Sequence, residues 1–374
     1  MAKYRVGLIG AGRKGTQHAR AYMLDERTEL VAVADGDPEN LALFQKRTGV
    51  PGYADYRQML EKEALDIAAP ILPVGVNPEV VIACAQAGVK AILCEKPIAA
   101  SLEEADRMVA ECKSRRIPFG AGDLDVNLPA YQKALEFIGA GELGAVKRIT
   151  LLGGSGTEMS GGGCQRFTLM RHFAGCDEVA WVSGWVCDDP LSEHDQGGAG
   201  YVRFANGIEA FTYRDKDARG RGYEVVCEDG VFYSDDNLAG LYRYVEGDGA
   251  SWEKLEKIEG VLPEGPIYGV YGEERGYDAE GWRCLGDRNR ASCKAIIDAL
   301  ERGEDPPGSG ENGVKVLEMA IAVRESHRQG CVPVALPLAD RSLRMVPRPG
   351  RMYNKKPIYG REKYMDQVLS QKKD

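Results

Sequence analysis

The first third of the chain alternates short apolar runs with segments of helical periodicity. The apolar runs predict strands at 4–9, 29–34, 65–69, 91–95 and 117–121, and the helical patterns lie at 13–24, 38–47, 55–62, 78–87 and 101–114. Ser101 and Glu104 have the spacing of a capping box at the start of the last helix. Nearly uniform apolar strands separated by helices are typical of a parallel sheet buried on both faces. Residues 1–122 are therefore predicted to form a doubly wound α/β domain.

After Gly122 the pattern changes. One helix is predicted near 129–140, followed by strands at 146–152, 179–187, 199–205, 208–214, 222–228 and 231–234 and by helices near 287–302 and 312–328. Glycine-containing turns between these strands predict a mostly antiparallel open sheet. The predicted organisation is a first domain at 1–122, a second α/β domain at 123–336 and a C-terminal arm at 337–374.

Composition adds few restrictions to this picture. The 374 residues are 44% hydrophobic and 28% charged, which suits two globular domains. No apolar run approaches the roughly 20 residues of a membrane span, and the first strand begins too early for a signal peptide. The ten cysteines are scattered, and no cluster of His, Cys or carboxylates has metal-ligand spacing. We therefore expect a cytoplasmic protein with reduced thiols and no metal site.

Charge is unevenly distributed along the chain. The net charge of −9 disfavours general nucleic-acid binding. Residues 341–374 contain ten Lys/Arg and three Asp/Glu, so this arm carries +7 and the rest carries −16. The arm also contains possible apolar anchors, namely Met345, Val346, Tyr353, Ile358 and Tyr359. We expect it to pack on its own chain or on a neighbouring subunit.

A glycine-rich segment joins the first predicted strand to the first predicted helix. Its sequence is Gly10-Ala11-Gly12-Arg13-Lys14-Gly15. In this context Gly10 allows a tight turn, Gly12 allows close approach of a pyrophosphate, and Gly15 allows close packing of helix against strand. The segment is therefore predicted to bind a dinucleotide.

Asp35 ends the second predicted strand, 20 residues after Gly15. A carboxylate at this place accepts hydrogen bonds from the adenine-ribose hydroxyls and repels a 2′-phosphate, which favours NAD over NADP. Arg13 and Lys14 partly offset that repulsion, so NADP stays an alternative.

Glu95-Lys96-Pro97 follows the apolar run 91–94 at the expected carboxyl end of a sheet strand. Ligands of open α/β sheets bind outside these ends. An ammonium there can hydrogen-bond the oxygen of a carbon that exchanges hydride. Lys96 is thus the leading catalytic candidate.

In combination these features resemble the Gfo/Idh/MocA oxidoreductase family. The match comprises the glycine loop, Asp35, the strand-ending Pro70, Glu95-Lys96-Pro97 and the antiparallel second domain, in this order over about 1–335. The resemblance implies a Rossmann domain joined to an open-sheet α/β domain, with the nicotinamide held between them by these residues and with a cis Lys96–Pro97 peptide. It further implies sugar, cyclitol or polyol substrates and homodimers or homotetramers formed through the open sheet face.

The second domain departs from the family pattern. Members typically carry a Gly-x-His-x-x-Asp-Leu-x-Arg-Tyr-x-x-Gly stretch, and its best ungapped match here begins at Gly163 and ends at Gly175. Gln165 then occupies the histidine position and Thr168 the aspartate position, and an amide does not exchange protons near neutral pH. A shifted alignment would give His172 the acid/base role; otherwise His172 is structural.

Other groups could supply the missing base. Asp123 and Asp125 follow the fifth strand, where either could act or could simply occupy an inter-domain turn. His18, inside the first helix, is interpreted as a packing or capping residue near the cofactor loop.

Three functions are consistent with this sequence. The leading one is an NAD-dependent oxidoreductase acting on a secondary alcohol of a sugar, glycoside or cyclitol, with Lys96 as the polarising and proton-exchanging group. The second is a redox-neutral NAD-dependent enzyme that cleaves or eliminates a glycoside. The third is a non-catalytic dinucleotide-binding protein.

Overall fold

The computed structural model describes residues 2–122, 125–153, 158–176, 178–214, 221–235, 238–245, 254–265, 267, 288–353, 361–362 and 365. The chain forms two compact units. The first contains residues 1–124, 270–314 and 348–374, and the second contains residues 125–269 and 315–347.

The first unit is built on a six-stranded parallel sheet in the order β3-β2-β1-β4-β5-β6. Its strands are β1 Tyr4–Ile9, β2 Thr28–Ala34, β3 Gly52–Tyr53, β4 Ile67–Pro70, β5 Ala91–Leu93 and β6 Phe119–Gly120. Strand order reverses between β1 and β4, where open α/β sheets bind ligands outside the carboxyl ends of their strands. The predicted doubly wound Rossmann fold is confirmed.

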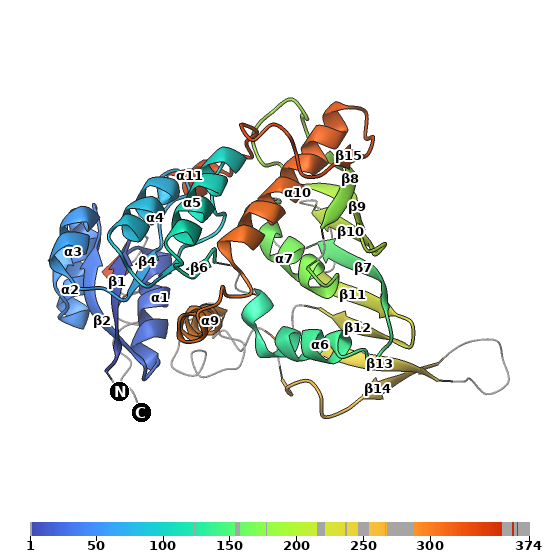
Figure 1. Ribbon diagram of the computed structural model, residues 1–374, viewed down its shortest axis with the longest axis horizontal. Helices are drawn as coiled ribbons and strands as arrows, with labels where there is room; N and C mark the ends of the chain where they lie inside the picture. The colour runs from blue at the N-terminus through green and yellow to red at the C-terminus, as the bar shows by residue number, and fades with distance from the viewer. Residues whose placement is uncertain are drawn as a thin grey trace. The chain divides into compact units, whose positions relative to one another are not determined.

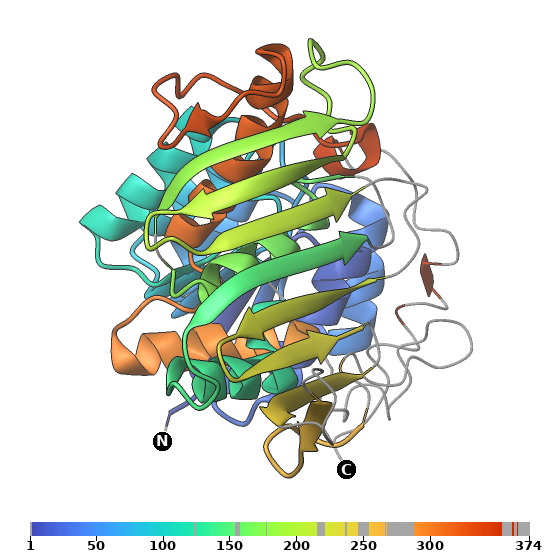
Figure 2. The same ribbon diagram turned by 90° about the vertical axis from the view of Figure 1, so that its right-hand side faces the viewer.

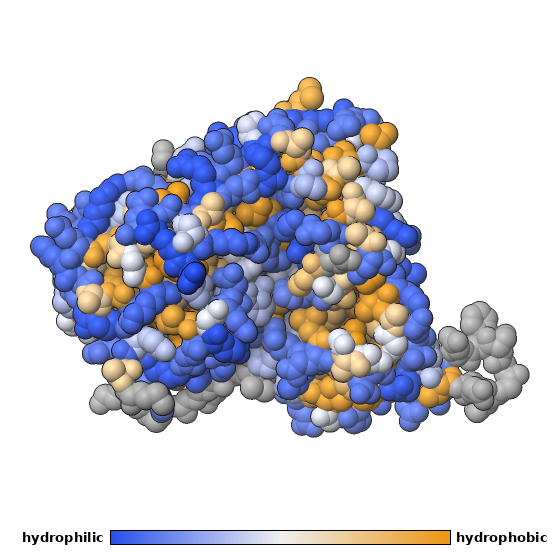
Figure 3. All heavy atoms as spheres, in the orientation of Figure 1, coloured by the Kyte–Doolittle hydropathy of each residue, from blue (hydrophilic) through white to orange (hydrophobic). Residues whose placement is uncertain are grey.

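Helices cover both faces of this sheet. They are α1 Arg13–Leu24, α2 Pro38–Thr48, α3 Tyr56–Lys62, α4 Asn77–Gln86, α5 Leu102–Ser114, α9 Arg288–Arg302 and α11 Pro349–Met352. Figure 1 shows α4 and α5 on one side of the sheet and α1 and α9 on the other. The Ser101 side chain caps α5 by accepting the Glu104 N–H at 3.3 Å, as predicted. Figure 3 shows a mostly polar outer surface on these helices.

The core of the first unit explains the uniform apolar strands. Val6, Leu8, Ile67 and Ala91 are fully buried in one apolar cluster with residues of α1. Helix α9, far away in sequence, contributes Cys293, Ile296 and Ile297 to the same cluster. From the sequence we predicted this helix in the 123–336 domain. Helical periodicity shows that one face is buried but does not show which unit that face packs against.

The C-terminal arm contacts its own chain. Met345 is buried and belongs to the second unit, whereas Met352 and Met365 are buried and belong to the first unit. Tyr353, another possible anchor, is 58% exposed on the single chain, so its packing on a neighbouring subunit stays a prediction. Val346 is half-buried and its carbonyl accepts the Asp195 N–H at 2.8 Å. Ile358 and Tyr359 lie outside the described residues.

The second unit is built on a nine-stranded sheet in the order β14-β13-β12-β11-β7-β10-β9-β8-β15. The strands are β7 Val146–Gly153, β8 Val179–Val186, β9 Gly198–Phe204, β10 Glu209–Arg214, β11 Arg221–Cys227, β12 Gly230–Ser234, β13 Ala239–Val245, β14 Lys254–Ile258 and β15 Val334–Ala335. All neighbouring pairs are antiparallel except β7 and β10. The predicted mostly antiparallel sheet is confirmed, while β13, β14 and β15 were not predicted.

Helices cover one face of this sheet. They are the 3-10 turn η1 Asp125–Asn127, α6 Pro129–Gly139, α7 Gly163–Phe173 and α10 Gly310–Arg328, which begins in the first unit. Tyr131 of α6 packs edge-on against Tyr223 of β11 with ring centroids 5.2 Å apart. Figure 2 looks onto the opposite face, where no helix of the described residues lies in front of the strands.

None of the described helices is both long enough and apolar enough to cross a membrane.

Candidate functional site

The glycine loop connects β1 to α1 and contains two positions that only glycine fits. Gly10 has φ +99°, and a Cβ there would lie 2.5 Å from the Ile71 carbonyl oxygen. A Cβ on Gly15 would lie 1.7 Å from the Gly10 carbonyl oxygen. Both contacts involve backbone atoms, so the loop has no simple way to relax around a larger residue.

The N-terminus of α1 is suited to an anion. Gly12 is its N-cap, no side chain caps the helix, and no acidic residue lies in the first turn. The helix therefore presents backbone N–H groups and the positive end of its dipole beside a loop without bulky side chains. The residues present fit a dinucleotide whose pyrophosphate rests on this turn.

The Asp35 carboxylate is held by two backbone hydrogen bonds, one of which comes from the glycine loop. Its Oδ2 accepts the Ala11 N–H at 2.6 Å, and its Oδ1 accepts the Asp37 N–H at 2.8 Å. Burial raises the pKa of Asp35, although these N–H donors oppose the shift. Asn40 adds a side-chain hydrogen bond to this carboxylate. A carboxylate offers about four acceptor sites, so capacity remains for a ribose hydroxyl.

Near Asp35, the C-terminal arm supplies a cation. Arg361 Nη1 lies 3.3 Å from Asp37 Oδ1 and 3.2 Å from Glu39 Oε2. Its charge is thus already paired with two carboxylates at the start of α2. The sequence analysis predicted Arg13 and Lys14 as the cations near the ribose and did not predict Arg361.

Pro70 and Glu95 stand at the carboxyl ends of the central strands. Pro70 is the buried last residue of β4, and Glu95 follows β5 with 7% exposure. Glu95 Oε1 lies 3.1 Å from His18 Nε2, and Glu95 Oε2 accepts the Lys96 N–H at 3.2 Å. Asn77 Nδ2 donates to the Glu95 carbonyl at 3.1 Å. His18 is therefore a partner of Glu95, a role that its position alone did not reveal.

The charges around Glu95 determine its ionisation. Burial alone would raise the pKa of Glu95, but the His18 hydrogen bond and the charges of Lys14 and Lys96 hold it far below its usual range. Glu95 is consequently an anion between two lysines. The Lys96–Pro97 peptide is cis, as the resemblance implied.

The other predicted catalytic residues that the structure describes lie in the second unit, on α7 and η1. Gln165, in the first turn of α7, is 6% exposed, and its Nε2 has no hydrogen-bond partner among the described residues. Thr168 is fully buried one turn later. An orphaned buried amide donor is costly unless a ligand satisfies it, so Gln165 is a candidate substrate contact.

His172 occupies the last turn of α7, seven residues after Gln165, which is roughly 10 Å along a helix axis. It is half-buried, and its Nδ1 lies 3.5 Å from Cys176 Sγ. Asp125 lies in η1 and is 2% exposed. Asp123 lies outside the described residues.

Two further polar groups of the second unit carry no sequence signal. Arg166 lies over the Tyr223 ring, 4.5 Å from its centroid. Buried Asp195 accepts the N–H groups of Met159, Ser160 and Gly197 and the Ser160 hydroxyl, at 2.6–3.2 Å. Asp195 thus fixes the segment that leads into α7, and only the folded chain brings it there.

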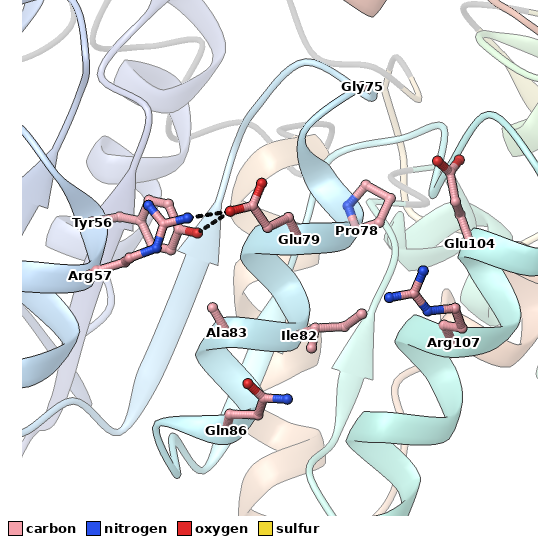
Figure 4. Close-up of a pocket in the computed structure, with 10 residues that line it drawn as sticks. All are labelled: Tyr56, Arg57, Gly75, Pro78, Glu79, Ile82, Ala83, Gln86, Glu104 and Arg107. Atoms are coloured by element: carbon pink, nitrogen blue, oxygen red, sulfur yellow. Dashed lines mark hydrogen bonds and ion pairs between the residues drawn. The ribbon is translucent and has the colours of Figure 1, made fainter.

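A hollow on the helical side of the first unit has a different character. Figure 4 shows Glu79 of α4 paired with Arg57 and hydrogen-bonded by the Tyr56 hydroxyl. The remaining lining comes from α4, α5 and the segment before α4 (Gly75, Pro78, Ile82, Ala83, Gln86, Glu104 and Arg107). It includes none of the predicted site residues.

Comparison with known proteins agrees with this geometry. Residues 4–122 match the family model GFO_IDH_MocA, described as an oxidoreductase family with an NAD-binding Rossmann fold. Over residues 4–122 the chain is thus similar to the Gfo/Idh/MocA oxidoreductase family.

Sequence relatives cover different shares of this chain. Myo-inositol 2-dehydrogenase of Thermotoga maritima is 32% identical over 136 residues, 35% of this chain and 40% of that protein. D-xylose 1-dehydrogenase (NADP(+)) 2 of Haloferax volcanii is 22% identical over 352 residues, 87% of this chain and 97% of that protein. The alignments span only about two fifths of the first two curated relatives, 40% and 38%.

The fold of the whole chain has solved counterparts. A levoglucosan dehydrogenase in complex with NADH superposes with a TM-score of 0.73 at 22% identity, covering 90% of this chain and 99% of that one. An NAD-binding oxidoreductase from Klebsiella pneumoniae gives 0.74 at 18% identity, covering 91% and 100%. At these identities the likeness establishes the fold.

Proposed function

We propose that this protein is an NAD(H)-dependent oxidoreductase acting on a secondary alcohol of a sugar, glycoside or cyclitol. The observation that carries the proposal is the conjunction, on one sheet edge, of the glycine loop tied to Asp35 and of Lys96 beside an ionised Glu95. The names of the relatives support the substrate class: inositol, xylose, apiose and levoglucosan dehydrogenases are among them.

Each part of the site has a distinct task in this reaction. The first turn of α1 would hold the pyrophosphate, and Asp35 would hold the adenine-ribose hydroxyls. The bound nucleotide supplies hydride exchange with the substrate carbon. Lys96 would donate a hydrogen bond to the reacting oxygen, where negative charge develops. In the second unit, the unpaired Gln165 amide is proposed to donate a hydrogen bond to a substrate oxygen.

A substrate screen tests the proposal. Purified protein, NAD+ and a library of sugars, glycosides and cyclitols should give reduced nicotinamide with at least one compound. Measurable NAD+ binding without reduction or substrate consumption across the library would instead support a non-catalytic dinucleotide-binding protein.

A redox-neutral eliminating enzyme is the second candidate. One relative, 29% identical over 139 residues, is named 2,7-anhydro-N-acetylneuraminate hydratase, a reaction name without net oxidation. Gln165 in place of a titratable histidine also departs from the family's dehydrogenase pattern. Substrate consumption without accumulation of reduced nucleotide would favour this second function.

Cofactor choice is expected to follow Asp35. NAD(H) should bind at least about tenfold more tightly than NADP(H), because a 2′-phosphate would lie beside this carboxylate. Asp35→Ser should reduce the difference between the two affinities, because it weakens NAD(H) binding and removes the charge that repels the 2′-phosphate of NADP(H). Fluorescence titration of both nucleotides measures this. One relative is named for NADP+, and equal or tighter NADP(H) binding here would refute the role of Asp35.

Gln165 and His172 should respond differently to substitution. Gln165→Ala is expected to lower kcat/KM, because the substrate loses one hydrogen bond with a free energy of about 1–3 kcal/mol. Nucleotide affinity should stay unchanged.

His172→Ala should mainly lower the free energy of unfolding, measured in a urea titration. Collapse of turnover in a folded, NAD-binding His172→Ala protein would assign the acid/base role to His172 and reject this arrangement.

The open sheet face is proposed as the contact with a second copy of the chain. Direct cross-strand pairing places Tyr201, Phe211, Thr150, Glu224 and Tyr233 in one row on this face. Tyr201 and Tyr233 are exposed, and Trp181 stacks on Tyr201 with ring centroids 6.1 Å apart. Exposed aromatic groups are typical of subunit interfaces.

Sedimentation tests the proposed assembly. The wild type should sediment as a dimer or tetramer, and Tyr201→Glu combined with Tyr233→Glu should shift it toward the monomer. Leu191→Glu, at a 75% exposed leucine outside the sheet, is the matched control and should leave the assembly unchanged. A monomeric wild type would reject the interface.

A further inference from the structure

Lys14 belongs to the predicted dinucleotide-binding segment, but the reaction proposed above gives its amino group no chemical role. It is the second residue of α1, four residues before His18. Residues at i and i+4 share one face of a helix. His18 bonds Glu95 at 3.1 Å, so the face of α1 that carries Lys14 is the one directed at Glu95.

The surroundings of Lys14 are strongly charged. The facing groups are Glu95 and Lys96 after β5 and Arg288 of α9, with Arg13 on its own helix. His18 and, beyond it, Cys293 complete the cluster, with Cys293 Sγ 3.7 Å from His18 Nδ1. Of the groups named here, Glu95 is the carboxylate, and Lys14, Lys96, Arg13 and Arg288 are cationic.

The Lys14 ammonium also lacks a fixed partner. Both Glu95 oxygens are engaged elsewhere, one with His18 and one with the Lys96 N–H. Within the described part of the chain no hydrogen bond or ion pair reaches Lys14 Nζ, although the side chain is half-buried. Burial lowers the pKa of Lys14 to about 8; the Glu95 charge opposes this shift and the Lys96 charge adds to it. Lys14 is therefore available to bind a ligand and to exchange a proton near neutral pH.

We propose that Lys14 is the proton-exchange group of the reaction and that Lys96 serves as the polarising group. This inference rests on the proposed oxidoreductase function. It assigns the acid/base role to Lys14, because the Gln165 amide does not exchange protons near neutral pH. In the oxidation direction the substrate O–H bond breaks and its proton passes to the neutral Lys14 amine. The C–H hydride leaves for the oxidised nucleotide, the C=O bond forms, and Lys14 later releases its proton to water.

The acidity of Lys14 is testable without any substrate. Limiting amine-reactive label, applied across a pH series and read by mass spectrometry, should give Lys14 a reactivity midpoint near 8. Exposed Lys62 and Lys133 serve as internal references. Glu95→Gln should move the Lys14 midpoint lower, because the carboxylate charge favours the ammonium. A midpoint at the ordinary lysine value, about 10.4, would overturn the proposal.

Turnover separates proton exchange from cofactor binding. Lys14→Met should lower kcat by about 100-fold or more, with NAD+ affinity within a few-fold. Lys14→Arg keeps the positive charge but cannot titrate, so it should lose turnover as well. The wild-type rate of oxidation should rise with pH through about 8, and this step should vanish in both variants. Lys133→Met, at an exposed lysine of α6, is the control for loss of a charge.

Other outcomes contradict the inference in distinguishable ways. If Lys14→Arg is active, or if Lys14→Met weakens NAD+ binding without changing kcat, Lys14 binds the cofactor phosphates and does not exchange the proton. Either result would overturn the role of Lys14 and would not contradict the proposed oxidoreductase function. A wild type that oxidises no substrate would reject the proposed function and the role of Lys14 together.

Discussion

Lys96→Ala is expected to lower kcat by about 100- to 1,000-fold, the usual cost of removing an oriented donor from an oxygen that gains charge. NAD+ affinity should change by no more than a few-fold, because the glycine loop and Asp35 hold the nucleotide. Steady-state kinetics and nucleotide titration on the same preparation measure the two effects. Loss of binding with unchanged kcat would show that Lys96 serves the cofactor and not the reacting oxygen.

The matched control for Lys96→Ala is Lys133→Ala, which removes an exposed lysine paired with Glu136 on the surface of the second unit. Exposed ion pairs contribute little to stability, about 0–1 kcal/mol. This control should keep both turnover and nucleotide affinity. A comparable loss of kcat in it would mean that the effect of Lys96→Ala is not specific to the site.

Gly15→Ala is the second change with a large expected effect. A methyl group 1.7 Å from the Gly10 carbonyl oxygen forces β1 and α1 apart at the glycine loop. Overpacking of this kind costs about 1–3 kcal/mol of unfolding free energy. Because the displaced backbone also forms the pyrophosphate site, NAD+ affinity should fall at least about tenfold. Urea unfolding and nucleotide titration measure the two losses.

Gly139→Ala provides the control for this substitution. Gly139 ends α6, and nothing lies within 4 Å of the place its Cβ would occupy. Both stability and nucleotide affinity should stay near the wild type. Normal NAD+ binding by Gly15→Ala would contradict the close packing attributed to the loop.

Local pattern was sufficient to predict most of the fold. Helix α1 was predicted at 13–24 and occupies Arg13–Leu24, because an apolar strand, a glycine turn and a periodic helix specify it within a few neighbouring residues. Strand β3 was missed because its two residues are too short to show any alternation. Strands β13 and β14 were missed because charged residues interrupt their apolar runs, Arg243 in β13 and Lys254, Glu256 and Lys257 in β14.

Long-range partners of the site could not be predicted in the same way. The glycine loop and Asp35 were named from spacing, but their hydrogen bond joins residues 24 positions apart. The His18–Glu95 pair spans 77 positions, and no periodicity in either segment indicates it. The same holds for Arg361 beside Asp37, 324 positions away. These pairs depend on sheet order and on the packing of the arm.

Transfer of a labelled hydride tests the central claim most directly. The protein would be incubated with NAD+ and with candidate sugars or cyclitols that carry deuterium on the ring carbons, and the nucleotide then isolated for mass spectrometry. An oxidoreductase should yield reduced nucleotide containing one deuterium, together with a product two hydrogens poorer than the substrate, and Lys96→Ala should yield almost none. Consumption of substrate with the nucleotide still oxidised and unlabelled would contradict the account.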